Sequence, residues 1–342
     1  MSSPTRPTLK SIARRLGISP STVSRTLNGQ GKSNRISDAT QQAVREMALE
    51  LGFAPNRLAR SLRLKKTATV GLVIPDVSNP FFAAIAHEVA VAAREHHYSI
   101  ALCDSQEETA VEVESLESLA HWHVEGLLVC PVGESGEHFR DWERGGTPLV
   151  VIDRVPPGCD FPSVTSDNRG GAKDATRYLL ECGHRRIACI QGIPTTSSNE
   201  ERLAGYREAM EAAGVQVDER LVVGESFLEE AGYCGMRKLL GAKPRPTAVF
   251  AFGNLLALGA MRAVRERGLT IPSDVSLIGF DDYPYADHLA APLTTVAQDC
   301  RALGRRSFER LYEAICSGQP AERACCRVPT TLVRRESVRS WE

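Results

Sequence analysis

The chain has 342 residues, of which 42% are hydrophobic and 24% are charged, and its formal net charge is −1. This length leaves room for more than one domain with a sizeable core. No stretch approaches the roughly 20 apolar residues that span a bilayer, and the first ten residues lack the apolar segment of a secretory signal. We therefore expect a cytoplasmic protein without a membrane partner.

The ten cysteines do not form a recognisable metal or disulfide pattern. They stand at positions 103, 130, 159, 182, 189, 234, 300, 316, 325 and 326, and none is part of a CxxC motif. In a reducing compartment such residues are mostly small buried hydrophobes or free thiols. The histidines at 96, 97, 121 and 123 lack partners at ligand spacing. We predict no metal site and no cofactor.

Charge is distributed very unevenly along the chain. Residues 1–66 contain thirteen Lys and Arg but only three Asp and Glu, whereas the remaining residues contain 28 and 39 respectively. The small net charge therefore conceals a basic N-terminal segment on an acidic remainder. A solvated helix face would mix the two signs, whereas this separation suits a segment that neutralises phosphates. The charge pattern predicts binding to DNA.

The stretch from residue 8 to residue 28 has the pattern of two short helices joined by a turn. Apolar residues at 9, 12, 13 and 16 follow helical spacing, with Thr8 as a capping residue, and Gly17 ends the run. Ser19 and Pro20 then suit an N-cap and the first position of a second helix, which carries Arg25 outward. Such a pair is typical of a helix-turn-helix. The alternative, two helices of a larger bundle, is disfavoured by the charge.

A third helix and a basic segment complete the N-terminal part. Ser37 is the expected N-cap of a helix that ends before Gly52, and Pro55 enforces an extended exit. Residues 56–66 then carry apolar side chains at 58 and 62 among five Lys and Arg. A helix this short is marginal in water. The segment is either a solvated linker or a helix stabilised by packing on DNA or on a second copy.

From residue 69 onward, short apolar strands alternate with helical segments. Strand-like runs cover 69–74, 99–103, 126–130, 148–152, 186–190, 248–252 and 275–280; helical stretches cover 81–95, 109–121, 170–182, 201–213, 229–240 and 254–267. Apolar strands alternating with helices indicate parallel sheets covered on both faces. The predicted fold class is α/β, with a small all-α head and a body of doubly wound parallel sheets.

Polar residues gather in the loops that follow these strands, where ligands of parallel sheets bind. The relevant loops are 75–80, 103–106, 153–154, 192–202, 253–254 and 281–285, and aromatic residues lie among them. Carboxylates, amides and aromatic faces together suit a polyhydroxylated small molecule. For any single loop residue, solvation or capping is an equally good explanation, so the prediction depends on their convergence.

An ordered series of motifs resembles the lac repressor/galactose repressor (LacI/GalR) family over nearly the whole chain. The matching stretches are SIARRLGISPSTVSRTLN, RISDATQQAV, LGFAPNRLARSL, VGLVIPDVSNPFF, VIDR, SDNRGG, GHRRIACIQG, ERLAGYREAM, ALGAMRAV, DVSLIGFDD and APLTTVAQD. The resemblance implies a bacterial transcription regulator, most often a repressor, that binds a pseudo-palindromic operator as a homodimer or as a tetramer.

The resemblance also assigns the residues that would contact operator DNA. Pro20, Ser21 and Arg25 match base-contacting positions of the recognition helix, and Arg25 suits a bidentate guanine contact. The resemblance implies that four further residues contact phosphates or support the turn: Thr8, Thr22, Ser24 and Asn28. Residues 56–62 match a hinge helix that enters the minor groove, beginning with Asn56 and Arg57. In it Leu62 would wedge into a base step with Ala59 and Arg63 packed beside it.

For the body, the resemblance implies two similar subdomains that bind an effector between them, and the expected effector is a carbohydrate or a sugar derivative. The head would comprise residues 1–55, the hinge 56–66 and the body 67–342. Within the body, the N-subdomain would comprise about 67–166 plus 296–326, and the C-subdomain about 167–295 plus 327–342. The matched effector-binding residues are Asp153, Arg202 and Asp281, followed by Asn79, Phe81 and Phe82. Effector binding would change operator affinity allosterically.

One position departs from the family pattern. The family commonly has Asn-Asp before the helix that contains ALGAMRA, and that Asn contacts the effector. Here the pair is Gly253-Asn254, preceded by Phe252. We expect the contact to be missing or shifted to Asn254, or replaced by stacking on Phe252.

Three other functions remain as alternatives. A regulator that responds to a corepressor or to a protein partner fits the same motifs. A sugar-binding transport receptor fits the body, but not the basic head. An enzyme is disfavoured because GxSxG, HExxH, GxxxxGK[ST] and GxGxxG motifs are absent from the sequence. We therefore predict that the protein is not an enzyme.

Overall fold

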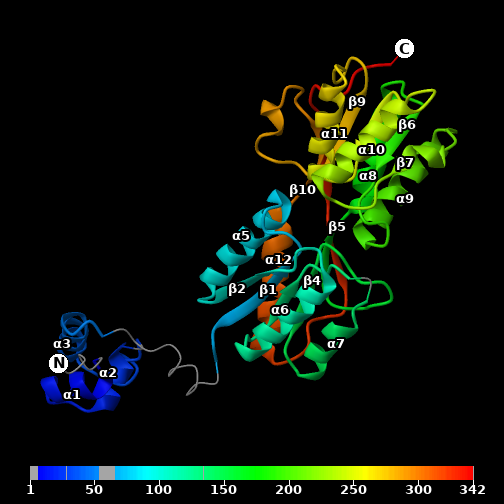
Figure 1. Ribbon diagram of the computed structural model, residues 1–342. Coiled ribbons are helices and arrows are strands. Elements are labelled where there is room, and N and C mark those ends of the chain that lie inside the picture. Colours follow the sequence, from blue (N-terminus) through cyan, green and yellow to red (C-terminus); the bar gives the residue numbers. More distant parts are fainter. Residues whose placement is uncertain (1–6, 28, 54–65, 134, 342) are drawn as a thin grey trace. The chain divides into compact units, whose positions relative to one another are not determined.

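The computed structural model describes residues 7–27, 29–53, 66–133 and 135–341. The chain forms two compact units, Met1–Thr67, which contains the predicted head and hinge, and Ala68–Glu342, which corresponds to the predicted body. Figure 1 shows the three helices of the head and the two sheets of the body, and each unit is described by itself. No helix in the described ranges is long and apolar enough to span a bilayer.

The head consists of α1 (Leu9–Leu16), α2 (Pro20–Leu27) and α3 (Asp38–Glu50). Its core is small and is formed by Ile12, Ala13, Val23, Val44 and Ala48, all at most 6% exposed. The predicted caps are confirmed: Thr8, Ser19 and Ser37 each accept a hydrogen bond from a backbone N–H three residues later. Gly17 takes a left-handed φ of 66° at the turn, a conformation that glycine adopts without strain.

The first sheet of the body has the strand order β11-β5-β4-β3-β1-β2, and every pair is parallel. Its strands are β1 (Thr69–Ile74), β2 (Ser99–Asp104), β3 (Leu127–Val129), β4 (Leu149–Ile152), β5 (Ser163–Ser166) and β11 (Cys325–Val328). One face packs against α5 (Pro80–Glu95) and α12 (Cys300–Ser317), and the other against α6 (Thr109–His121) and α7 (Glu137–Arg144). We call this layer the N-subdomain.

The second sheet has the order β12-β10-β9-β8-β6-β7, with β12 antiparallel to β10. Its strands are β6 (Ile187–Ile190), β7 (Val222–Val223), β8 (Ala248–Ala251), β9 (Ser276–Phe280), β10 (Thr294–Gln298) and β12 (Thr330–Val333). Around it lie α8 (Asn168–Glu181) paired with α9 (Ser197–Ala212), and α10 (Glu229–Gly241) paired with α11 (Asn254–Glu266). Short 3₁₀ turns cover Glu219–Leu221 and Ala286–His288. We call this layer the C-subdomain.

Three described segments carry the chain between the two sheets. They lie between β5 and α8, between β10 and α12, and between β11 and β12. Each subdomain is therefore assembled from segments that are distant in the sequence. This arrangement places the carboxyl ends of both sheets toward each other, where the loops expected to bind a ligand meet.

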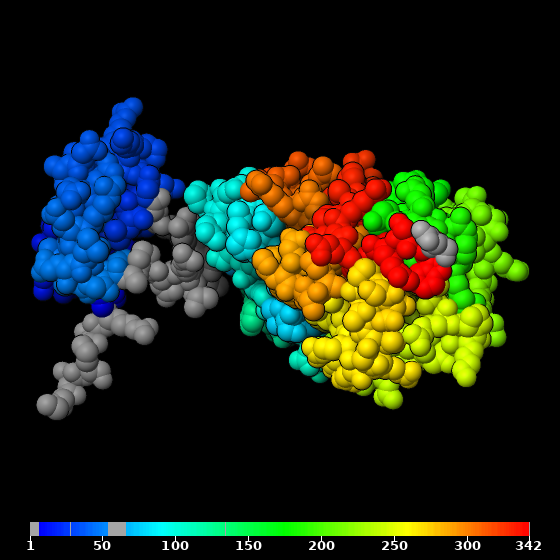
Figure 2. Space-filling view, turned by 90° about the horizontal axis from the view of Figure 1, so that it is seen from above, coloured from blue at the N-terminus to red at the C-terminus, as the bar shows by residue number. Residues whose placement is uncertain are grey.

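The C-terminal residues form a strap along the second sheet. Leu277 donates its N–H to the Ser337 carbonyl, and the Trp341 N–H donates to the Cys182 carbonyl. Ser337 itself is fully buried, and its hydroxyl donates to the Leu277 carbonyl at 2.6 Å. Figure 2 shows the end of the chain, in red, lying on the surface of the body beside yellow and green segments of the C-subdomain.

The α/β fold class and the two-sheet body predicted from the sequence are confirmed. Several elements escaped the pattern analysis, namely the helices α7 and α12 and the strands β5, β7, β10, β11 and β12. These strands have two to five residues, and those at the junction carry Ser, Thr or Cys, so they lack the apolar run that indicates a strand.

Candidate effector cavity and DNA-binding head

A small polar cavity lies between the carboxyl ends of the two sheets. Its volume is about 20 Å³, and its lining residues are Asn79, Phe81, Phe82, Asp153, Arg154, Ser198, Arg202, Phe227, Gly253, Asn254 and Asp281. Both subdomains contribute to it: Asn79 to Phe82 begin α5 of the N-subdomain, whereas Asn254 begins α11 of the C-subdomain. The cavity thus brings together seven of the eight residues predicted from the sequence.

Two buried acids are held in an unusual backbone conformation. Asp153 follows β4 with a φ of 66°, and Asp281 follows β9 with a φ of 72°. Positive φ is strained for most non-glycine residues and is concentrated at functional sites. The backbone N–H of Asp153 donates to the Val164 carbonyl at 3.0 Å, and that of Asp281 donates to the Val296 carbonyl at 2.9 Å. These bonds fix the backbone of both acids. The strand ends therefore aim both carboxylates into the cavity region.

The Asp153 carboxylate is only partly compensated. It is 4% exposed, and its Oδ1 atom has no hydrogen-bond partner among the described residues. Burial raises the pKa of Asp153, although the nearby guanidinium groups of Arg154 and Arg202 act in the opposite direction. A buried acceptor without a partner is costly. It is well suited to accept a hydrogen bond from a ligand hydroxyl.

The two buried arginines are engaged by the protein. Arg202 donates from Nε to Asn168 Oδ1 at 2.8 Å, donates from Nη1 to the Phe252 carbonyl, and lies 3.7 Å from the centre of the Phe280 ring. Arg154 forms two hydrogen bonds to the Glu107 carboxylate, at 2.7 and 2.8 Å. These bonds fix the guanidinium planes and use two of the five N–H donors of each arginine, and Arg154 Nε is buried without a hydrogen-bond partner among the described residues.

Phe252 is the one predicted effector residue that does not line the cavity. Its side chain is fully buried in the core of the C-subdomain, and only its carbonyl approaches the site, through Arg202. Phe227 occupies the region where stacking was expected. A Cβ atom on Gly253 would lie 3.3 Å from the Phe227 ring, and the Arg154 guanidinium lies 5.1 Å from the centre of that ring.

Sequence reasoning did not single out Phe227 or Ser198. Phe227 follows the two-residue strand β7, which is too short to be detected by periodicity, so its loop was not counted among the strand ends. Ser198 belongs to the first turn of α9, which was expected to begin at residue 201 rather than at Ser197. A search for aromatic residues in glycine-flanked loops would have found Phe227.

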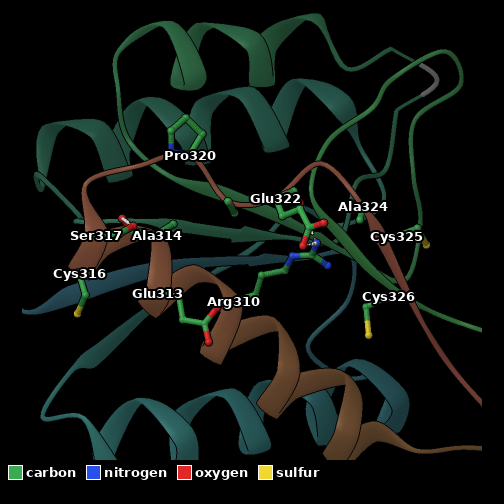
Figure 3. A pocket seen from close by; sticks show the side chains of 11 residues that line it. Arg310, Glu313, Ala314, Cys316, Ser317, Pro320, Glu322, Ala324, Cys325 and Cys326 are labelled. Carbon is green, nitrogen blue, oxygen red and sulfur yellow. Dashed lines mark hydrogen bonds and ion pairs between the residues drawn. The ribbon is translucent and has the colours of Figure 1, made fainter.

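A second, larger groove lies along the end of α12 and involves the N-subdomain alone. Arg310, Glu313, Cys316, Glu322, Cys325 and Cys326 are among its lining residues. Figure 3 shows the Cys316 and Cys325 side chains at opposite ends of this groove. No group of three His, Cys, Asp or Glu side chains within the described residues is arranged to hold a metal ion. The groove contains none of the predicted effector residues.

In the head, the predicted DNA-contacting side chains lie on and around α2. Thr8, Pro20, Ser21 and Arg25 are exposed, whereas Thr22 and Ser24 are partly buried. Thr8 and Ser11 form a reciprocal capping box at the start of α1, and the Thr22 hydroxyl lies 2.9 Å from that of Ser19. The remaining predicted positions lie outside the described residues: Asn28, Asn56, Arg57, Ala59, Leu62 and Arg63.

Together, a helix-turn-helix head and a two-lobed body with a polar cavity define a ligand-binding transcription regulator. The pattern of bacterial regulatory proteins of the lacI family matches residues 8–56, and that of a periplasmic binding protein-like domain matches residues 176–338. The chain is 37% identical to the HTH-type transcriptional regulator CelR of Thermobifida fusca, over 97% of this chain and 98% of the relative. It is 36% identical to the HTH-type transcriptional regulator DegA of Bacillus subtilis (strain 168), over 96% of this chain and 98% of the relative.

The chain therefore belongs to the lacI family of bacterial transcriptional regulators, whose members are not enzymes. Solved structures agree with this assignment. A complex of CelR with cellobiose matches with a TM-score of 0.74 and 36% identity, covering 97% of this chain and 100% of the other. A lac repressor dimer bound to operator and the anti-inducer ONPF matches with a TM-score of 0.86 and 26% identity. This match covers 98% of this chain and 100% of the lac repressor chain.

Proposed function

We propose that this protein is a repressor that binds a pseudo-palindromic operator as a homodimer and is controlled by a small sugar bound between its subdomains. The observation that carries the proposal is the convergence of Asn79, Asp153, Arg202 and Asp281, from both subdomains, on one polar cavity. A ligand that touches both subdomains biases their relative orientation. Such coupling is typically worth about 1–3 kcal/mol, or 5- to 150-fold in affinity.

The head reads DNA through the exposed start of α2. Arg25, Ser21 and Pro20 contact base edges in the major groove, and Arg25 makes a bidentate contact with guanine. Thr8, Thr22, Ser24 and Asn28 contact phosphates or support the turn. The basic charge of the head strengthens binding by releasing counterions. The lac repressor dimer on its operator supports this docking by analogy.

Residues 56–66 form the hinge that connects the DNA-binding head to the effector-binding body. Asn56 and Arg57 begin the segment, Leu62 enters the minor groove, and Ala59 and Arg63 pack beside it. Except for Lys66, these positions lie outside the described residues, and the proposal rests on the family resemblance and on the marginal stability of so short a helix. The division into head 1–55, hinge 56–66 and body 67–342 follows the same reasoning.

The effector is an uncharged polyhydroxylated molecule. Glu107 neutralises Arg154, and the carboxylates of Asp153 and Asp281 line the cavity beside Arg202, so the site has no surplus positive charge for an anion. The unpartnered Asp153 oxygen favours a ligand hydroxyl as donor. The cellobiose complex of a relative supports a sugar by analogy. A protein of this kind acts in the cytoplasm, where bacterial DNA is located.

Selection of binders from a random duplex-DNA pool by the full-length protein at physiological salt tests the proposal. We expect one palindrome with a fixed half-site spacing, and then a change in its affinity on titration with a panel of neutral sugars that includes cellobiose. A decrease identifies an inducer and an increase identifies a corepressor. Weak binding without a motif, with and without cell metabolites, would contradict the function.

A further inference from the structure

The first residue of the body is held by a side chain from the entry of a neighbouring strand. Ala68, which directly precedes β1, donates its N–H to Glu125 Oε1 at 2.6 Å, although the two residues are 57 positions apart. The other oxygen, Glu125 Oε2, accepts from the Tyr98 hydroxyl at 2.8 Å. Tyr98 directly precedes β2, and Glu125 lies two residues before β3. One carboxylate therefore connects the entries of three adjacent strands, β2, β1 and β3.

Backbone hydrogen bonds hold the same segment from both sides. The Ser99 N–H, at the start of β2, donates to the Ala68 carbonyl at 2.8 Å. The Glu125 N–H donates to the Thr69 carbonyl, also at 2.8 Å. Both backbone groups of Ala68 are thus bound, the N–H by the Glu125 side chain and the carbonyl by β2.

Ala68 has a left-handed backbone conformation with a φ of 48°. Residues with a Cβ atom disfavour this conformation. His97 and His123 share it, but each follows the C-cap of a helix, α5 or α6, where it is common. Ala68 instead precedes a strand, and the two described residues before it are not helical. Such a conformation persists where the surroundings enforce it, and the bonds to Glu125 and Ser99 provide that enforcement.

Helix α12 holds the Tyr98 ring in place. The ring packs edge-to-face on Phe308 and Tyr312, with centroid distances of 6.3 and 5.9 Å. Burial raises the pKa of Tyr98, and the bond to Glu125 acts in the same direction, so the phenol keeps its proton and donates it to the carboxylate. The fixed hydroxyl in turn orients the Glu125 carboxylate toward Ala68.

We propose that Glu125, oriented by Tyr98, is a positioning residue that fixes the point where the hinge joins the body and thereby raises operator affinity. We call its contacts with Ala68 and Tyr98 the Glu125 clamp. Without the clamp Ala68 can turn to an ordinary φ, and its backbone must be ordered again on operator binding. Ordering one residue corresponds to roughly a 5- to 30-fold change in an equilibrium constant.

The effect on operator affinity rests on the proposed function, because only two half-sites at a fixed spacing require both heads to be positioned. The contact between Glu125 and Ala68 does not rest on it. Binding to DNA of random sequence depends on phosphate contacts of the head. The clamp should therefore affect operator affinity and leave the affinity for random-sequence DNA unchanged.

Hydrogen–deuterium exchange of the full-length protein without DNA tests the clamp itself. Glu125→Ala removes both side-chain bonds, whereas Tyr98→Phe removes the hydroxyl and keeps the ring. One net hydrogen bond corresponds to roughly a 2- to 12-fold change in an equilibrium constant. We expect peptides that cover residue 68 to exchange faster by that factor in Glu125→Ala, and by less in Tyr98→Phe.

Tyr312→Phe is the matched control for both measurements. It removes a hydroxyl from the same aromatic group, and within the described residues Glu125 accepts from Ala68 and Tyr98 instead. Its exchange and its operator affinity should equal those of wild type. Unchanged exchange at residue 68 in Glu125→Ala, or equally faster exchange in Tyr312→Phe, would overturn the clamp.

Binding to the selected operator and to a random-sequence duplex at the same salt tests the positioning role. Glu125→Ala should weaken operator binding roughly 5- to 30-fold, and Tyr98→Phe roughly 2- to 12-fold. The double variant should bind like Glu125→Ala, because the hydroxyl acts only through the carboxylate. A purely structural role would lower the melting temperature and both DNA affinities together.

The outcomes separate this proposal from the proposed function. Wild-type operator affinity in Glu125→Ala, an equal loss on random-sequence DNA, or an additive effect of Tyr98→Phe overturns the positioning role. If Glu125→Ala does not fold, Tyr98→Phe alone decides in the same way. If the wild-type protein selects no operator, the proposed function fails and the effect on operator affinity fails with it. Exchange at residue 68 then still decides whether Glu125 holds the start of the body.

Discussion

At the scale of single residues, the cavity concentrates features that work against stability. Asp153 and Asp281 have positive φ, and Asp153 Oδ1 is buried without a partner. Such features persist only where the surroundings enforce them, and they are typical of sites that are preorganised for a ligand. The surrounding strands β4 and β9 and the anchored N–H groups provide that enforcement.

Replacing Asp153 by Asn should raise the thermal stability of the protein at pH 7. Burial raises the pKa of Asp153, so its folded state disfavours the ionised form relative to the unfolded chain. The associated destabilisation is absent below the ordinary Asp pKa of 3.8 and develops as the pH rises through the pKa of the folded state. Melting curves of wild type and Asp153→Asn should therefore converge as the pH falls toward 3.8.

The exposed Asp160 provides the control for this comparison. Its carboxylate pairs with Arg323 at 2.6 Å on the surface, where an ion pair contributes at most about 1 kcal/mol. Asp160→Asn should not raise the melting temperature at pH 7. If Asp153→Asn is less stable than wild type at pH 7, the burial argument is wrong.

Replacing Arg25 by Ala should reduce sequence recognition more than general DNA affinity. Loss of a bidentate guanine contact amounts to about 1–3 kcal/mol, or roughly 5- to 150-fold in affinity for the selected operator. Tolerance should also increase at one base pair of each half-site. Binding measurements on the operator and its single-base variants check this expectation.

Lys10→Ala is the matched control, because Lys10 is exposed on α1 and carries the same charge. It should weaken binding to all sequences alike through a lost phosphate interaction. A loss of discrimination in Lys10→Ala, with none in Arg25→Ala, would show that α2 does not read bases.

The polar and aromatic residues that follow the predicted strands were sufficient to predict most of the cavity lining. Asp153 and Asp281 could be predicted because each directly follows an apolar strand. The hydrogen bond from Asn254 Nδ2 to Asn79 Oδ1 could not, since two distant helix starts meet only through the packing of separate subdomains. Phe227 was missed because the strand before it has only two residues and gave no strand signal.

At the scale of elements, close helix pairs depend on glycine. Cβ atoms placed on Gly259 of α11 and Gly232 of α10 would lie 1.9 Å from the Glu229 carbonyl oxygen and 2.2 Å from that of Leu256. The two helices therefore approach backbone to backbone. The strands missed from the sequence are all short, and those at the junction of the subdomains also carry polar residues.

Gly259→Ala should destabilise the body through overpacking of α10 against α11. Inserting a methyl group into a well-packed contact costs about 1–3 kcal/mol, which lowers the melting temperature by roughly 2–12 °C for a domain of this size. Calorimetry measures the shift. Gly241, at the end of α10, has open space around its Cβ position, so Gly241→Ala should be neutral or slightly stabilising. Equal effects of the two changes would refute this packing.

At the scale of the whole molecule, the C-terminal strap connects distant parts of the C-subdomain through His184. The Arg339 carbonyl can only accept, so His184 donates to it from Nε2 at 3.1 Å. His184 Nδ1 then accepts from the Thr247 hydroxyl at 2.9 Å in the neutral ring. The imidazole thereby links the strap to the residue that precedes β8.

The stability of the body should fall as the pH decreases through about 6.5, in part because of His184. Burial lowers the pKa of His184 from its ordinary value of 6.5, so the unfolded chain binds this proton more readily than the folded chain. The contribution to stability is present above pH 6.5 and is lost as the pH falls. His184→Gln keeps a donor and an acceptor without titrating, so its melting temperature should decrease less than that of wild type between pH 7.5 and 5.5.

The exposed His288 offers a comparison on the same subdomain. His288→Gln should retain the pH dependence of wild type. If His184→Gln loses as much stability on acidification as wild type does, the buried imidazole is not the origin of that dependence.

The three crossings between the sheets also constrain how the chain is made. During synthesis, β1 to β5 leave the ribosome first, but α12 and β11, which complete their sheet, follow only after most of the C-subdomain. Until then the N-subdomain has one sheet edge and the part of one face that α12 covers exposed, while roughly 130 residues of its neighbour emerge. Neither subdomain can be produced from a continuous fragment with a complete sheet. Both subdomains must therefore be translated as one chain before either sheet is complete.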